Sequence, residues 1–187
     1  MLQGQNMMSW TIETNALPTP WLRADDFVSD GRLISDIHWW GSYLDWMKYD
    51  PGSETNPIAP PIAMYAPLGF NLSWHMSSTS PCRPINQLMN MYVGLDKCHQ
   101  VYYGSVTQYW SQPIKTYEHE YQYYVDLLDP ALNIPWAETN NVHYWLNSQA
   151  VFRTNFVPTP TIHRGWGWKI TPSNNNQLCY SVVSTDG

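Results

Sequence analysis

The stretch that decides the fold runs from residue 22 to residue 46 and reads LRADDFVSDGRLISDIHWWGSYLDW. A short strand pattern, Ala24–Val28, is followed by the turn-forming triplet Ser29–Gly31, and a long β-branched and aromatic run begins at Leu33. Strand-forming residues on both sides of a Ser-Asp-Gly turn favour a β-hairpin, and no helix start or stop signal lies near them. The stretch therefore predicts a hairpin inside an all-β fold.

Period-two alternation of apolar and polar residues recurs along the chain and indicates half-buried antiparallel strands. It covers residues 70–76, 117–127, 142–152 and 178–182, and residues 99–111 read as a further strand with aromatic residues on both faces. Helical character is confined to one turn near Ile85–Met91. We expect an all-β, jelly-roll-like antiparallel β-sandwich over residues 20–187, preceded by an extended segment, residues 1–19.

Two long loops rich in proline, Asp50–Pro67 and Asn155–His163, interrupt this pattern. Proline holds such loops in extended conformations and lowers the entropy cost of ordering them. Loops of this length are uncommon unless they have a function.

The composition is rich in large rings and poor in charge. Aromatic residues make up 15% of the chain and charged residues 13%, with 15 prolines and 10 glycines. This profile is typical of many short strands around an aromatic core. A net charge of −6 argues against nucleic acid and anionic membrane surfaces as partners, and no apolar run is long enough for a transmembrane helix.

The strand faces predict the core. Trp39 and Trp40 are adjacent in one strand, so they point to opposite faces and only one of them belongs to the core. The residues expected to be buried between two sheets are Phe27, Ile37, Trp39, Leu72, Trp74, Tyr144, Leu146 and Trp168.

The opening stretch resembles an uncharacterised β-sandwich domain family from secreted proteins of environmental bacteria. That family begins with Ala-Asp-Asp-Phe/Trp and continues with Ile-Thr-Asp-Ile-His-Trp-Trp-Gly-Ser-Tyr/Trp. The matching residues here are Ala24, Asp25, Asp26, Phe27, Ile34, Asp36, Ile37, His38, Trp39, Trp40, Gly41, Ser42 and Tyr43. Looser matches downstream are Asp129-Pro130, a Tyr-Trp-Leu strand at His143–Leu146 and a Gly-Trp-Lys strand at Gly167–Ile170. The family has no assigned activity.

The resemblance implies an exported protein that works outside the cell or at its surface. Residues 1–10 lack the basic start and apolar core of a signal peptide, so we interpret the chain as a processed or trimmed form. In an oxidising compartment Cys82 and Cys98 are expected to form a disulfide, with Cys179 free; the alternative is three free, buried thiols.

Metal and catalytic motifs are weak. Asp25, Asp26 and Asp36 are the candidates for a calcium site, although adjacent carboxylates in a strand point to opposite faces; the alternative is that they cap turns or are solvated. Members of the family that this chain resembles often carry carboxylates where it has Asn174–Leu178, so any ion site that those carboxylates form in relatives is expected to be missing here. No cysteine spacing matches a zinc motif, no catalytic constellation is visible, and no cofactor is expected.

The aromatic residues remain as binding candidates. We expect a non-catalytic extracellular module that assembles with other copies of itself into a filament or surface layer. The alternative is a carbohydrate-binding module that stacks polysaccharide on exposed rings; a hydrolase is a third class without a legible site. The binding residues for either function are Trp10, Ile12, Trp40, Trp46, Tyr65 and Trp110. In the assembly reading, residues Ser9–Glu13 add a strand to a neighbouring copy, with Trp10 and Ile12 inserting on one face.

Overall fold

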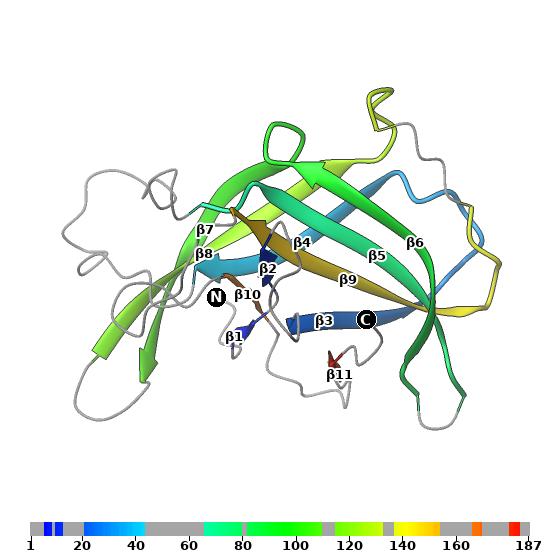
Figure 1. The fold of residues 1–187 in the computed structure, drawn as a ribbon, viewed down its shortest axis with the longest axis horizontal. Coiled ribbons are helices and arrows are strands. Elements are labelled where there is room, and N and C mark those ends of the chain that lie inside the picture. The colour runs from blue at the N-terminus through cyan, green and yellow to red at the C-terminus, as the bar shows by residue number, and fades with distance from the viewer. Residues whose placement is uncertain are drawn as a thin grey trace.

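The computed structural model describes residues 6–8, 10–12, 21–43, 66–79, 82–109, 115–132, 137–153, 166–169 and 180–183. In these parts of the chain the regular elements are strands (Figure 1). They are β1 (Asn6–Met8), β2 (Trp10–Ile12), β3 (Trp21–Val28), β4 (Asp36–Tyr43), β5 (Gly69–Ser77), β6 (Pro84–Gly94), β7 (His99–Tyr109), β8 (Lys115–Asp126), β9 (His143–Phe152), β10 (Trp166–Lys169) and β11 (Tyr180–Val183). None of the described residues forms a helix long and apolar enough to cross a membrane.

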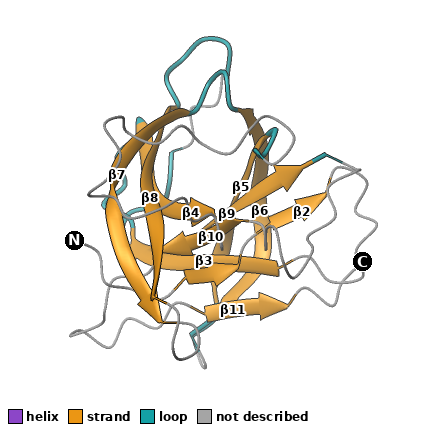
Figure 2. Cartoon of the chain, turned by 90° about the vertical axis from the view of Figure 1, so that its left-hand side faces the viewer, coloured by secondary structure: helices purple, strands orange, loops and turns teal. Residues whose placement is uncertain are grey.

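The strands form two sheets, which enclose the core from opposite sides (Figure 2). Sheet A has the order β1-β10-β4-β8-β7, and sheet B has the order β11-β3-β9-β5-β6, with β2 also paired to β9. All the pairs are antiparallel except β2–β9, which is parallel. The predicted antiparallel β-sandwich is therefore confirmed.

The opening stretch is not a hairpin, and that prediction is wrong. Its two strands belong to different sheets, because β3 pairs with β9 and β11 whereas β4 pairs with β8 and β10. The connection, residues 29–35, is longer than the two to five residues usual in hairpins. Its backbone bonds to other loops: Ser29 N–H donates to Val142 O at 3.0 Å, and Ser35 O accepts from Leu127 N–H at 2.8 Å. These hydrogen bonds hold the connection in the conformation in which the chain passes from sheet B to sheet A.

The other strand predictions are confirmed at the level of the element. β5, β7, β8 and β9 occupy the predicted segments, and β11 covers the end of the segment 178–182. The exception is the helical turn near Ile85–Met91, which is wrong because these residues lie within β6. There they pair with β5 across a bulge at Trp74–Met76. The polar residues of β6 alternate irregularly because of this bulge, and that irregularity hides the strand period in the sequence.

Large rings fill the core between the sheets. Six of the predicted core residues are buried, namely Ile37, Trp39, Leu72, Trp74, Tyr144 and Trp168, and Phe27 and Leu146 are partly buried against the core. At its centre the rings of Trp39, Phe70, Tyr123 and Trp166 contact one another, with centroids 4.9 to 5.7 Å apart. The buried Trp166 Nε1–H donates to the Tyr123 hydroxyl at 3.1 Å.

The amino-terminal segment contributes one strand to each sheet. β1 pairs with β10 in sheet A, and β2 pairs with β9 in sheet B, where Trp10 lies opposite Ala150 and Ile12 opposite Phe152. The expected strand over Ser9–Glu13 therefore forms in part, but it pairs within its own chain rather than with a neighbouring copy. The expectation that this strand is donated to another copy is therefore corrected to pairing with β9 of the same chain.

Candidate functional site

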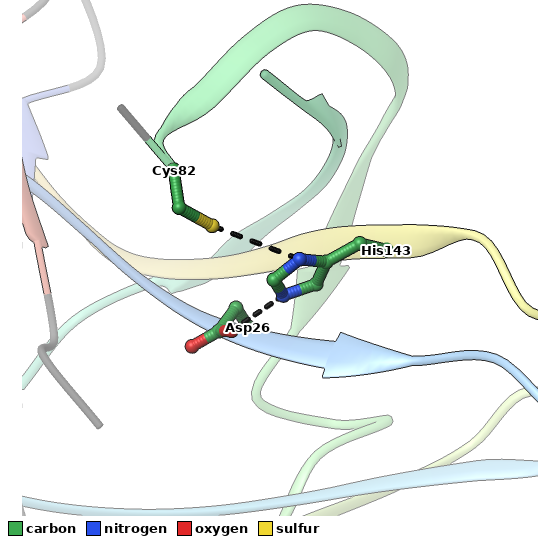
Figure 3. Close-up of side chains that lie close together, drawn as sticks. All are labelled: Asp26, Cys82 and His143. Carbon is green, nitrogen blue, oxygen red and sulfur yellow. Dashed lines mark hydrogen bonds and ion pairs between the residues drawn. The ribbon is translucent and has the colours of Figure 1, made fainter. Parts of the chain in front are cut away.

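Three polar side chains from distant parts of the sequence meet on the outer face of sheet B (Figure 3). Asp26 lies in β3, His143 is the first residue of β9, and Cys82 lies in the connection between β5 and β6. His143 Nε2 is 2.5 Å from Asp26 Oδ2, and His143 Nδ1 is 3.6 Å from Cys82 Sγ. We call these three residues the Cys–His–Asp cluster. Among the described residues, it is the one group of three or more His, Cys, Asp or Glu side chains that are close enough to share a metal ion.

Strand register places the carboxylate beside the imidazole. β3 and β9 pair with Asp26 opposite Trp145 and Val28 opposite His143, so Asp26 and His143 are diagonal neighbours on the same face. Phe27 and Tyr144 point the other way, and their rings meet at 6.1 Å. The sheet therefore fixes this pair through the same register that buries the core.

The cysteine comes from the connection between β5 and β6. Ser77, the last residue of β5, has its Oγ 3.3 Å from Cys82 Sγ, and Ser78 N–H donates to Arg83 O at 2.9 Å. These contacts fold the connection back toward β9. Cys82 therefore reaches a histidine that follows it by 61 residues.

The ring of His143 packs against a buried tryptophan. It stacks on the indole of Trp145, with centroids 6.0 Å apart and planes 19° apart, and Trp145 is 1% exposed. The cluster itself stays accessible, because 33% of the His143 side chain and 20% of the Asp26 side chain are exposed and Cys82 is partly buried.

We assign one arrangement of protons to the cluster from its contacts. With an ionised Asp26 as acceptor, a neutral His143 donates its Nε2–H, Nδ1 keeps its lone pair, and the Cys82 thiol donates to Nδ1. This order, thiol to imidazole to carboxylate, allows His143 to remove the thiol proton while Asp26 stabilises the resulting imidazolium.

A comparison with known protein families matches residues 2–186 to a domain of unknown function, DUF7901. The chain belongs to this family. The expectation of an uncharacterised domain family is therefore confirmed in that form. Comparisons with curated proteins and with solved structures gave no match.

The residues proposed for calcium do not converge. Asp25 and Asp26 point to opposite faces of β3, because they lie opposite consecutive residues, Leu146 and Trp145. Asp36 begins β4 in the other sheet and lies 3.6 Å from His38 Nε2. Of the three, only Asp26 belongs to the Cys–His–Asp cluster, where its partners are sulfur and nitrogen rather than the oxygen atoms that calcium prefers.

The predicted Cys82–Cys98 disulfide is wrong, because both cysteines are free. They lie beyond opposite ends of β6, whose 11 residues span roughly 35 Å at a strand's rise. A disulfide needs Cα atoms closer than about 7 Å. Cys98 is instead buried in the core, and burial raises the pKa of its thiol to about 12. Cys179 lies outside the described residues.

The aromatic binding candidates are scattered. Trp40 is half-buried on the outer face of sheet A, where its ring meets Tyr103 edge-on at 6.3 Å. Trp10 and Ile12 lie in β2. Trp46, Tyr65 and Trp110 lie outside the described residues. Of the six binding candidates, only Trp40 is found in a described surface ring pair, with Tyr103; a second group of rings on the same face of sheet A joins His38, Tyr124 and His99.

Two long sheet edges form a second candidate surface. β6 ends sheet B and β7 ends sheet A, and they diverge from the turn at residues 95–98 (Figure 1). Each has 11 residues, and neither contains Asp, Glu, Lys or Arg. Exposed apolar side chains lie along them: Leu88 is 44% exposed in β6, and Val101 and Tyr103 are 57% and 50% exposed in β7. We call β6 and β7 the uncharged edges.

The sequence singles out each member of the cluster separately. It presents Asp26 as a calcium candidate, Cys82 as a disulfide partner and His143 as part of a strand motif. No short spacing links the three residues, because β3, β9 and the β5–β6 connection come together only through sheet pairing. The uncharged edges did leave a signal, since residues 84–109 contain only Asp96 and Lys97 as charged residues, both in the turn.

Proposed function

We propose that this domain is a non-catalytic structural module that assembles with copies of itself through the uncharged edges. The observation that carries the proposal is the combination of length, exposure and lack of charge on β6 and β7. An edge strand presents a row of backbone donors and acceptors to solvent, and natural proteins usually guard long edges with lysine, proline or bulges. β6 has a proline only at its first residue, and β7 has no proline. Each edge does carry a bulge, opposite Trp74–Met76 in β6 and at Tyr102–Gly104 in β7, but neither edge carries a lysine.

Pairing β6 of one copy with β7 of the next satisfies both edges at once. A contact between two different surfaces is heterologous, so it propagates into a filament or layer unless the rotation closes a ring. Pairing of β6 with β6 alone would close a dimer and leave β7 open. Covering both edges isologously would need a second contact, β7 with β7, whereas the heterologous arrangement covers both edges with one kind of contact.

The proposal includes an extracellular or cell-surface location. It is supported by the low share of charged residues, 13%, and by the resemblance of the opening stretch to a secreted domain. Fractionation of the source cells with an antibody to this domain tests the location independently of assembly.

The assembly test places a lysine on each edge. Leu88→Lys and Val101→Lys should each shift the protein to smaller species in native mass spectrometry and light scattering, and the double variant should be monomeric. Leu33→Lys is the matched control, because Leu33 is 46% exposed in the connection between β3 and β4 and pairs with Ala137 rather than with either edge. A wild-type chain that is monomeric at high concentration, or edge variants that assemble normally, would overturn the proposal.

Carbohydrate binding is the second candidate, and the pair Trp40 and Tyr103 is the observation that favours it. The rings meet at 78°, so they offer a sugar one ring face rather than a flat platform. Isothermal titration calorimetry with soluble polysaccharides tests this candidate. Binding that Tyr103→Ala abolishes, in a chain that stays monomeric, would favour carbohydrate binding over assembly.

A further inference from the structure

We propose that Cys82 is a nucleophilic thiol that accepts acyl groups from activated esters or thioesters, with His143 as its general base and Asp26 as a positioning residue. This inference goes beyond assembly and does not depend on it. It rests on the geometry of the Cys–His–Asp cluster (Figure 3).

The two ring nitrogens of His143 contact different partners, and this is the arrangement that a general base needs. Nδ1 faces the thiol at 3.6 Å, within hydrogen-bond reach for sulfur, and Nε2 faces the Asp26 carboxylate at 2.5 Å. A nucleophile, a base and a residue that orients the base are the parts of an activated thiol. Each part comes from a different element, so the arrangement is a product of the fold rather than of local sequence.

The environment favours reaction at Cys82 over the other described cysteine. Cys82, His143 and Asp26 are each partly exposed, so we expect a small acyl donor to reach the cluster from solvent. Trp145 stacks behind His143 and restricts its rotation. Cys98, by contrast, is buried in the core with a raised pKa, which makes it an internal reference in the same molecule.

The proposed step is a single acyl transfer. Cys82 Sγ attacks the acyl carbonyl carbon while its proton passes to His143 Nδ1, and Asp26 stabilises the imidazolium through Nε2–H. The new S–C bond forms, the C–O bond of the ester breaks, and the leaving oxygen takes the proton from Nδ1. The product is an S-acyl cysteine and an alcohol, with no change of oxidation state.

A metal ion is the competing occupant, and the geometry disfavours it. Asp26, Cys82 and His143 each offer one ligand atom, but in the assigned arrangement Asp26 accepts from Nε2–H and orients the histidine. Among the described residues, Cys82 Sγ and His143 Nδ1 then remain as direct ligands. Protein zinc sites generally supply at least three direct ligands. The experiment below also tests whether Zn²⁺ binds the cluster and protects Cys82 from acetylation.

The experiment treats the full chain with p-nitrophenyl acetate and follows acetylation of each cysteine by peptide mass spectrometry. In the wild type, Cys82 should be acetylated while Cys98 is not. His143→Gln should lower the rate at Cys82 by at least about tenfold, since general bases usually contribute about 100-fold or more. His75→Gln is the matched control, because His75 is a partly buried histidine on β5 bonded to Ser73 rather than to a cysteine.

Two further measurements separate a chemical role from a structural one. Free imidazole should restore acetylation in His143→Ala, and Asp26→Glu should retain more rate than Asp26→Asn, with unchanged circular dichroism and unfolding midpoint. Equal rates in folded wild type and His143→Gln would overturn the proposal. One equivalent of Zn²⁺ that blocks acetylation would also overturn it in favour of a metal site, and so would a disulfide found at Cys82 in the native chain.

Discussion

Trp39 of β4 and Tyr123 of β8 lie directly opposite each other in sheet A, and their rings stack with centroids 5.5 Å apart and planes 11° apart. Phe70 from sheet B meets both rings edge-on. This contact joins the two sheets at the centre of the core. The two adjacent tryptophans therefore have different environments: Trp39 packs in the core, whereas Trp40 faces outward.

Trp39→Ala should lower the free energy of unfolding by about 3–5 kcal/mol, the usual cost of removing a large aromatic side chain from a core. The matched control is Trp40→Ala, which should cost roughly 1–2 kcal/mol because Trp40 is only half-buried. Urea unfolding monitored by circular dichroism measures both. Equal costs at the two positions would contradict the assignment of faces in β4.

Gly41 is required by the close approach of Trp166. A Cβ at Gly41 would lie 2.1 Å from the Trp166 ring, and that ring is held in place by its hydrogen bond to Tyr123. Gly41→Ala should therefore cost about 1–3 kcal/mol, the usual range for overpacking.

Gly104→Ala is the control for this substitution, because a Cβ at Gly104 meets nothing within 4 Å. Its effect should stay within about 1 kcal/mol in either direction. Thermal unfolding of both variants decides the point, and a Gly41→Ala protein as stable as wild type would show that the indole of Trp166 can move.

Glu138 should make the stability of the protein depend on pH in an unusual direction. Burial raises the pKa of Glu138 and the Asp30 charge raises it further, against a hydrogen bond from Ser29 that lowers it. An acid with a raised folded pKa favours folding below its ordinary pKa of 4.5, and this contribution is lost as the pH rises through the folded pKa. Glu138→Gln should therefore be more stable than wild type at neutral pH, and the difference should disappear in acid.

Asp129 gives the opposite sign and serves as the control. The backbone N–H of Ala131 and the Lys97 ammonium, 2.9 Å away, lower the pKa of Asp129. Its contribution to stability is present above its ordinary pKa of 3.8 and is lost as the pH falls. Asp129→Asn should be less stable than wild type at neutral pH, with the difference shrinking in acid. Urea midpoints across the pH range that show the same sign for both variants would refute this account.

Removing residues 1–15 should destabilise the folded chain. β1 and β2 each pair over three residues, with β10 and β9, and a backbone hydrogen bond contributes about 0.5–1.5 kcal/mol. The unfolding midpoint of the truncated chain should therefore fall. A truncated chain with unchanged stability would show that the two strands contribute little to either sheet.

The class of fold and most of the strands follow from local patterns in the amino-acid sequence. Alternation in β5, β8 and β9 follows from the two-residue period of a strand, so the inward residues Leu72, Trp74 and Tyr144 could be identified before any pairing was known. The opposite directions of Trp39 and Trp40 follow from the same period. Local chemistry was sufficient for these features because each depends only on residues adjacent in the chain.

Tertiary structure decided which strands are neighbours. The Ser-Asp-Gly turn reads as a hairpin, yet β3 and β4 enter different sheets because the backbone of residues 29–35 bonds to Val142 and Leu127, far along the chain. The Cys–His–Asp cluster depends on the same long-range pairing, since the β3–β9 register brings Asp26 beside His143 and the β5–β6 connection adds Cys82. The alternation within a strand fixes which face it buries and so constrains its register, but it does not identify the strand that it pairs with; that choice depends on contacts between residues distant in the chain.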